Sequence, residues 1–159
     1  MRHVTTALFA AALAGFPAGA QALFGAPGGV CFSSETTTYR VVTDAARPDY
    51  SVRIAPANEA VDLRVQMIDQ AELADFVLVD DPDDAEATSC ANAPNAIKTL
   101  AVSPNAPAPD LTISVTTHAA PTDTTKYKIF VRSEKFTPAQ AAALFAVLVK
   151  SGPRAFAGR

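Results

Sequence analysis

Short segments in which apolar and polar residues alternate are the dominant pattern of this chain. Residues 50–54, 63–67 and 111–115 each follow a period of two. Such a period places the apolar side chains on one face of a β-strand and the polar ones on the other, which predicts a sheet with one face against a core and one in water. The remaining strands are predicted at residues 37–43, 76–79, 97–102 and 126–132.

Two features of the pattern predict how the strands are arranged. The turn-forming residues 47–49 separate the segments 37–43 and 50–54, which predicts a β-hairpin. Residues 76–79 are apolar at every position, which predicts a central strand covered on both faces, and residues 70–75 before it predict one helical turn. The spacing of the segments indicates no internal repeat.

One α-helix is predicted, near the C-terminus. Thr137 is a suitable N-cap, Pro138 suits the first turn, and Gln140 completes a capping box. The helix then covers residues 139–150 and is ended by the Gly-Pro pair at 152–153. Its broad apolar face, flanked by alanines, predicts close packing against the sheet.

The expected fold class is therefore α+β. We expect an antiparallel or mixed sheet of about six to seven strands, with the C-terminal helix packed on it. A β-sandwich with an appended helix is the alternative. Residues 23–159 are enough for a single domain with a substantial core.

The first 22 residues have the layout of a secretory signal peptide. Arg2 precedes the uncharged, largely apolar run 4–16, and the small residues Ala20 and Ala22 stand before a cleavage site at Leu23. The run is too short to span a bilayer, and no later run reaches that length. The sequence predicts a periplasmic or secreted protein whose mature chain has no transmembrane segment.

The two cysteines, Cys31 and Cys90, are interpreted in the light of export. An oxidising compartment favours a bridge between an even pair of cysteines. Their separation resembles neither a redox pair nor a zinc pair. We therefore predict a disulfide within a single domain over residues 23–159.

The charge of the chain excludes one class of partner and suggests a cation site. There are 13 basic and 16 acidic residues and a net charge of −3, which opposes binding to nucleic acid. Carboxylates converging from one loop are the ligands that calcium prefers. A hard-cation site is thus an alternative function for the acidic turn at residues 80–86, whose members are Asp80, Asp81, Asp83, Asp84 and Glu86.

Several basic residues occupy the polar positions of the predicted strands. If these strands are neighbours, their cations line one face with an aromatic residue among them, a combination that is common in interaction surfaces. Such a face suits an envelope protein, an anionic glycan or a lipid headgroup. The predicted partner-binding residues are Arg53, Arg64, Lys128, Phe130 and Arg132.

The sequence carries little sign of catalysis. His118 is the one histidine after the predicted cleavage site, and its imidazole could act as a general base. No nucleophile elbow or glycine-rich phosphate loop accompanies it. We expect a protein that is not an enzyme and needs no cofactor, with Ca²⁺ as the alternative.

Three segments carry a resemblance to known proteins: TYRVVTDAARPDYSVRI, VDLRVQMIDQAELADFVLVDD and YKIFVRSEKFTPAQAAALFAVL. They resemble small exported alphaproteobacterial proteins of unknown function. The stretch ADFVLVDD is also similar to a strand of periplasmic domains of the TolB N-terminal and curli-secretion type. The resemblance implies no activity. Together with export, it predicts a non-catalytic periplasmic module that binds an envelope partner or an anionic ligand.

Overall fold

The structure, a computed structural model, describes residues 29–34, 37–80, 90, 96–117 and 127–151. Predictions for other positions, including the signal peptide, lie outside the described residues. The elements are β1 (Val30–Ser33), β2 (Thr38–Val42), β3 (Tyr50–Ala55), β4 (Leu63–Met67), the 3-10 turn η1 (Ala71–Leu73), β5 (Phe76–Val79), β6 (Ile97–Ser103), β7 (Leu111–Thr116), β8 (Tyr127–Arg132) and α1 (Pro138–Ser151).

The helix α1 begins as the sequence predicts. The backbone N–H of Gln140 donates to Thr137 Oγ1 at 3.3 Å, and the N–H of Thr137 donates to Gln140 Oε1 at 3.0 Å. This reciprocal pair is the predicted capping box, which satisfies two N–H groups at the helix start. Within the described ranges, no helix has the length and apolar character needed to cross a membrane.

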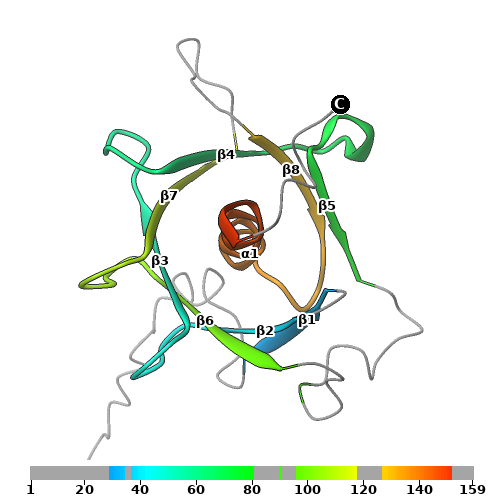
Figure 1. Cartoon of the computed structure of the whole chain (residues 1–159). Helices are drawn as coiled ribbons and strands as arrows, with labels where there is room; N and C mark the ends of the chain where they lie inside the picture. Colours follow the sequence, from blue (N-terminus) through cyan, green and yellow to red (C-terminus); the bar gives the residue numbers. More distant parts are fainter. Residues whose placement is uncertain (1–28, 35–36, 81–89, 91–95, 118–126, 152–159) are drawn as a thin grey trace, which may run out of the picture.

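The sheet curls around α1 (Figure 1). Its order is β1-β2-β6-β3-β7-β4-β8-β5, and α1 contacts β2, β3, β4, β6, β7 and β8. Seven consecutive residues of α1, Ala141 to Val147, are all buried, together with inward residues of the sheet such as Val52, Val65 and Ile129. The α+β class and the mixed sheet are therefore confirmed. The strand number is eight because β1 was not predicted, and the single sheet excludes the β-sandwich alternative for the described residues.

The strands of the first half of the chain alternate in the sheet with those of the second half. β6 pairs in parallel with both β2 and β3, β7 with both β3 and β4, and β8 with both β4 and β5. The predicted hairpin between β2 and β3 is therefore wrong, since the two strands are parallel and β6 lies between them. Leu100 pairs with Val41 at the end of β2 and with Tyr50 at the start of β3. A short connection suffices because β3 begins at the level where β2 ends.

The strand β5 is the last in the sheet, not a central strand as predicted. It pairs with β8 and with no other described strand. Leu78 is buried in the core and Phe76 packs against it, whereas Val77 and Val79 face outward and are 46% and 55% exposed. The continuous apolar run therefore reflects an apolar outer surface and not burial on both faces.

An aspartate directly before a strand is repeated in this fold. Asp62 precedes β4, donates its N–H to the carbonyl of Thr112 at 2.8 Å, and accepts the N–H of Thr112 on Oδ2 at 2.7 Å. Three further aspartates each exchange the same two bonds with one residue of a neighbouring strand, the pairs being Asp49 with Thr99, Asp75 with Lys128, and Asp110 with Ser51.

These aspartates extend the sheet by one step where the chain arrives from a loop. In a regular parallel ladder, a main-chain carbonyl would accept the N–H that the carboxylate accepts here. Asp49, Asp62 and Asp75 are spaced thirteen residues apart, and each is followed by an apolar residue. The chain thus contains an internal repeat, and the expectation of none is wrong.

Replacing Asp62 by alanine is expected to lower the free energy of unfolding by about 1–2 kcal/mol, because the N–H of Thr112 loses a charge-assisted bond. Asp62→Asn should cost less, since the amide oxygen still accepts. Asp69 is an exposed aspartate in the next loop, and Asp69→Ala should change stability by under about 0.5 kcal/mol. Urea unfolding of the three variants measures these differences; equal values for Asp62→Ala and Asp69→Ala would contradict the role of the carboxylate.

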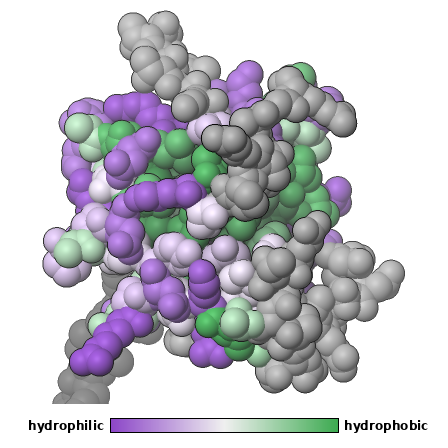
Figure 2. Space-filling view, in the orientation of Figure 1, coloured by the Kyte–Doolittle hydropathy of each residue, from purple (hydrophilic) through white to green (hydrophobic). Residues whose placement is uncertain are grey.

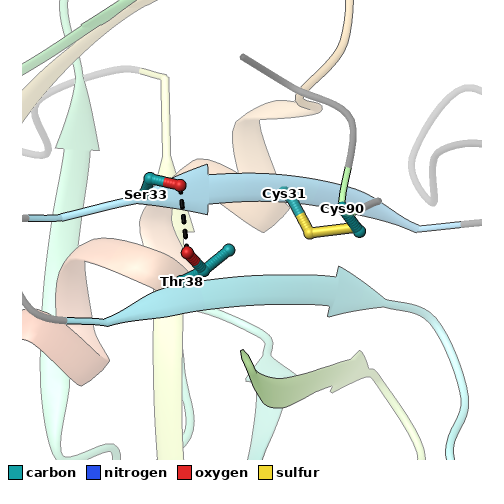
Figure 3. Close-up of a disulfide and its surroundings, with 4 residues drawn as sticks. All are labelled: Cys31, Ser33, Thr38 and Cys90. Atoms are coloured by element: carbon teal, nitrogen blue, oxygen red, sulfur yellow. Dashed lines mark hydrogen bonds between the residues drawn. A yellow bond between two sulfur atoms is a disulfide. The ribbon is translucent and has the colours of Figure 1, made fainter. Parts of the chain in front are cut away.

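A disulfide joins Cys31 to Cys90, as the sequence predicts (Figure 3). The two Cα atoms are 5.4 Å apart and the residues are 59 positions apart in the chain. Cys31 lies on β1, a strand of four residues at the edge of the sheet, and its side chain is buried. Ser33 Oγ and Thr38 Oγ1 form a hydrogen bond of 3.0 Å between β1 and β2. The bridge thus fixes the first strand to the chain that enters β6.

Candidate functional site

The five predicted partner-binding residues all lie on the outer face of the curled sheet, but they do not form one patch. Arg53 is on β3, Arg64 is on β4, and Lys128, Phe130 and Arg132 are on β8. In the sheet, β7 and β4 lie between β3 and β8. The structure therefore separates the arginines of the first half of the chain from the residues of β8.

Arg53 and Arg64 both bind the loop that connects β3 with β4. Arg53 forms an ion pair of 2.9 Å with the carboxylate of Glu59. Arg64 donates to the main-chain carbonyls of Ala57 and Glu59, the latter at 3.0 Å. Their guanidinium groups are thus occupied in holding this loop over the sheet. The sequence could not show this role, because it depends on where the loop returns.

The residues on β8 are differently placed. Lys128 and Arg132 are exposed, and neither side chain has an ion-pair partner among the described residues. Phe130 is half-buried and pairs with Val77 of β5, while Arg132 pairs with Val79. The cations of β8 therefore lie beside exposed valines on the neighbouring strand.

A third element adds an apolar side chain to this region. The turn η1 contacts β8, and its Leu73 is 59% exposed. On the side where Figure 1 places β5, Figure 2 shows apolar side chains among hydrophilic ones. We define the β5/β8 surface as Leu73, Val77, Val79, Lys128, Phe130 and Arg132. The sequence pattern did not indicate its three aliphatic members: Val77 and Val79 lie in an apolar run that predicts a buried strand, and Leu73 lies in the predicted helical turn.

Exposed aliphatic side chains of this size are concentrated in few places. Among the described residues, the large hydrophobic side chains that are exposed are Leu73, Val77, Val79 and Ile97. Three of these four belong to the β5/β8 surface. Contiguous apolar surface with a charged border is a feature of interaction sites.

Asp80, at the end of β5, has a structural role. Its Oδ1 accepts a bond from the hydroxyl of Ser133 at 2.7 Å, and its Oδ2 accepts the N–H groups of Glu134 and Lys135 at 2.6 Å and 3.3 Å. Partial burial raises the pKa of Asp80, but these bonds and the charge of Lys135 outweigh it, so the pKa lies below its ordinary value. The ionised carboxylate connects β5 with the segment leading into α1.

The proposed cation site stays a prediction. Asp81, Asp83, Asp84 and Glu86 lie outside the described residues, and both oxygens of Asp80 are already hydrogen bonded. Within the part of the chain that the structure describes, no cluster of three or more histidine, cysteine or acidic residues could hold a metal.

Lys98 forms a polar contact that the sequence did not reveal. Its Nζ lies 3.4 Å from the hydroxyl of Tyr50 and 5.5 Å from the centre of that ring. The hydrogen bond to Tyr50 raises the pKa of Lys98. The Tyr50 ring in turn lies 6.2 Å from that of Tyr39. This ammonium group therefore stays charged beside two aromatic rings.

An open groove of about 810 Å³ lies between the loops around residues 43–48 and 103–110. Its ionisable side chains are Asp44 and Asp110, and Asp110 is bonded to the N–H of Ser51. Neither histidine nor cysteine is among its lining residues. His118, the one general base considered from the sequence, lies outside the described residues.

Comparison of the chain with family models, curated proteins and solved structures finds no match. The resemblance to exported alphaproteobacterial proteins and to TolB-type or curli-type domains therefore stays a prediction. A proposal for the function therefore depends on the positions of the residues in this structure.

Proposed function

We propose that this chain is an exported, non-catalytic protein that binds a partner protein of the cell envelope through the β5/β8 surface. The observation that carries the proposal is the exposure of Val77 and Val79 directly beside Phe130 and Arg132 on the neighbouring strand. The surface combines apolar area, which gives binding energy, with cations, which give orientation and specificity.

Two observations support export. The Cys31–Cys90 disulfide is the kind of bond that persists in oxidising compartments. Residues 1–22 have the charge and hydropathy order of a cleavable signal. A periplasmic or secreted protein meets envelope proteins, anionic glycans and lipid headgroups. The valines favour a protein among these, because a purely anionic ligand would gain nothing from exposed aliphatic side chains.

The proposed site differs from the set of partner-binding residues that the sequence predicts. Lys128, Phe130 and Arg132 remain in the proposed site, whereas Arg53 and Arg64 are bound to the Glu59 loop. Leu73, Val77 and Val79 are added. The proposed site is thus centred on the last two strands of the sheet and not on its middle.

Site-specific photocrosslinking tests the proposal. A benzoyl-phenylalanine at Val79, introduced into the protein expressed with its own leader, is expected to give a discrete adduct in the envelope fraction. The same group at Arg47, an exposed position on another loop, should give none. Arg132→Glu should reduce the adduct from position 79 at least tenfold. No adduct at Val79, or equal adducts at both positions, would overturn the assignment of the surface.

A further inference from the structure

The main chain of β5 forms an open edge of the sheet. Asp80, directly after β5, donates its N–H to the carbonyl of Arg132 on β8. Because successive residues of a strand direct their main-chain groups to opposite sides, Phe76 and Leu78 also face β8, and the N–H and carbonyl groups of Val77 and Val79 point away from it. No described strand pairs with that side of β5.

This edge lacks the features by which proteins usually block strand addition. Lysine, proline, bulges and very polar edge residues prevent a second chain from pairing. The four residues of β5 are Phe76, Val77, Leu78 and Val79, with neither lysine nor proline among them. The side chains of Val77 and Val79 lie on the outer face of the sheet, where they would contact every second side chain of an added strand.

The charge beside the edge indicates what an added segment would carry. Lys128 and Arg132 are exposed on β8, the next strand in. The ion pair found among the described residues, Arg53 with Glu59, involves neither of them. Acidic side chains on the outer face of an added strand would therefore meet two cations that have no ion-pair partner among the described residues, whereas basic side chains would be repelled.

We infer that the partner of the β5/β8 surface binds by strand addition, as an extended segment that alternates aliphatic and acidic residues and pairs with the free edge of β5. The inference rests on the proposed function and specifies its mode. Main-chain bonds to Val77 and Val79 would supply the pairing, while the outward side chains of these valines and the cations of β8 would select the sequence.

Peptide binding to the purified protein tests this mode. The probe is a blocked decapeptide of alternating valine and glutamate, followed by amide chemical shifts and hydrogen exchange. We expect saturable binding, with the amides of Val77 and Val79 gaining at least tenfold protection from exchange, whereas those of Phe76 and Leu78, which face β8, should change little. A valine and lysine decapeptide should bind at least tenfold more weakly.

Two controls separate strand addition from simple contact with the surface. N-methylation of alternate probe residues removes main-chain donors without changing the side chains, so one of the two methylated sets should lose at least tenfold in affinity. Val77→Lys and Arg132→Glu should each weaken binding by a similar factor, and Arg47→Glu should leave it unchanged. Thermal melts of these exposed-site variants check that each is folded.

The outcomes distinguish this inference from the proposed function. Absence of probe binding, or binding that neither methylated set weakens, would overturn strand addition, while the crosslink at Val79 could still support a partner on this surface. A concentration-dependent dimer that Val77→Lys disperses, without probe binding, would instead assign the edge to a second copy of the chain.

Discussion

Removal of the Cys31–Cys90 disulfide is expected to destabilise the protein by about 4 kcal/mol. The bridge closes a loop across 59 positions, and in the chain-entropy model a loop of this size restricts the unfolded chain by that amount. A single domain has a total stability of about 5–15 kcal/mol, so the loss is a large part of it. The Cys31→Ala/Cys90→Ala variant should therefore melt roughly 10 °C lower.

The location of the bridge gives the same expectation from the folded state. β1 has four residues and pairs with β2 as the antiparallel edge of an otherwise parallel sheet. Without the bond from Cys31 to Cys90, this strand depends on its ladder with β2 and on the Ser33–Thr38 bond. Hydrogen exchange of the β1 amides should accordingly increase more than that of β7.

The reduced wild-type protein is the control for this measurement. It keeps both sulfur atoms and loses the bond alone, so its stability should match that of the double alanine variant to within about 1 kcal/mol, after allowance for the buried side chain of Cys31. Equal urea midpoints for the oxidised and reduced protein would contradict the assigned role. The same comparison measures how far the fold depends on an oxidising compartment.

The sequence predicted the local elements of this fold better than their arrangement. The pattern of apolar and polar residues located seven strands, and Thr137 with Gln140 located the start of α1, because both signals act over a few neighbouring residues. Strand pairing depends on residues far apart in the chain. A short connection between β2 and β3 usually belongs to a hairpin, and nothing local shows that β6 lies between them.

One distant feature could have been found in the sequence. Asp49, Asp62 and Asp75 recur every thirteen residues, each directly before an apolar strand residue. A repeat of that kind indicates that successive units are equivalent in space, which hairpins would not allow because they reverse direction. The missing signal was therefore the turn chemistry of the aspartates and not the hydrophobic pattern.

The candidate site shows the same division. The outward phase of Lys128, Phe130 and Arg132 followed from the period of β8. The role of Arg53 and Arg64 did not, since their partner Glu59 is reached only through the path of a loop. Val77 and Val79 were missed because apolar residues on both faces of a strand normally indicate burial, whereas these two side chains are exposed at the edge of the sheet.

Replacing Phe145 by alanine is expected to cost about 3–5 kcal/mol, the typical loss for a fully buried phenylalanine. The side chain is 1% exposed and lies on α1 at the centre of the curled sheet. Its ring is 5.3 Å from the ring of Phe76 on β5 and 5.3 Å from that of Tyr127 on β8. The substitution would leave a cavity between α1 and the sheet. Among the described residues α1 is the only α-helix, so the strands would have to move inward to fill that cavity.

Phe130→Ala is the matched control, because it removes a phenylalanine side chain from the outer face of β8, whereas Phe145 on α1 packs against Tyr127 of the same strand inside the curled sheet. Phe130 is half-buried, so its loss should cost about 1 kcal/mol, well below that of Phe145. Urea unfolding of both variants measures the difference; equal costs would mean that the outer face is packed as a core is. If Phe130→Ala is less destabilising than Phe145→Ala, the Phe130 variant is suitable for binding experiments. A change in its crosslinking or peptide affinity would then result from altered recognition and not from a less stable fold.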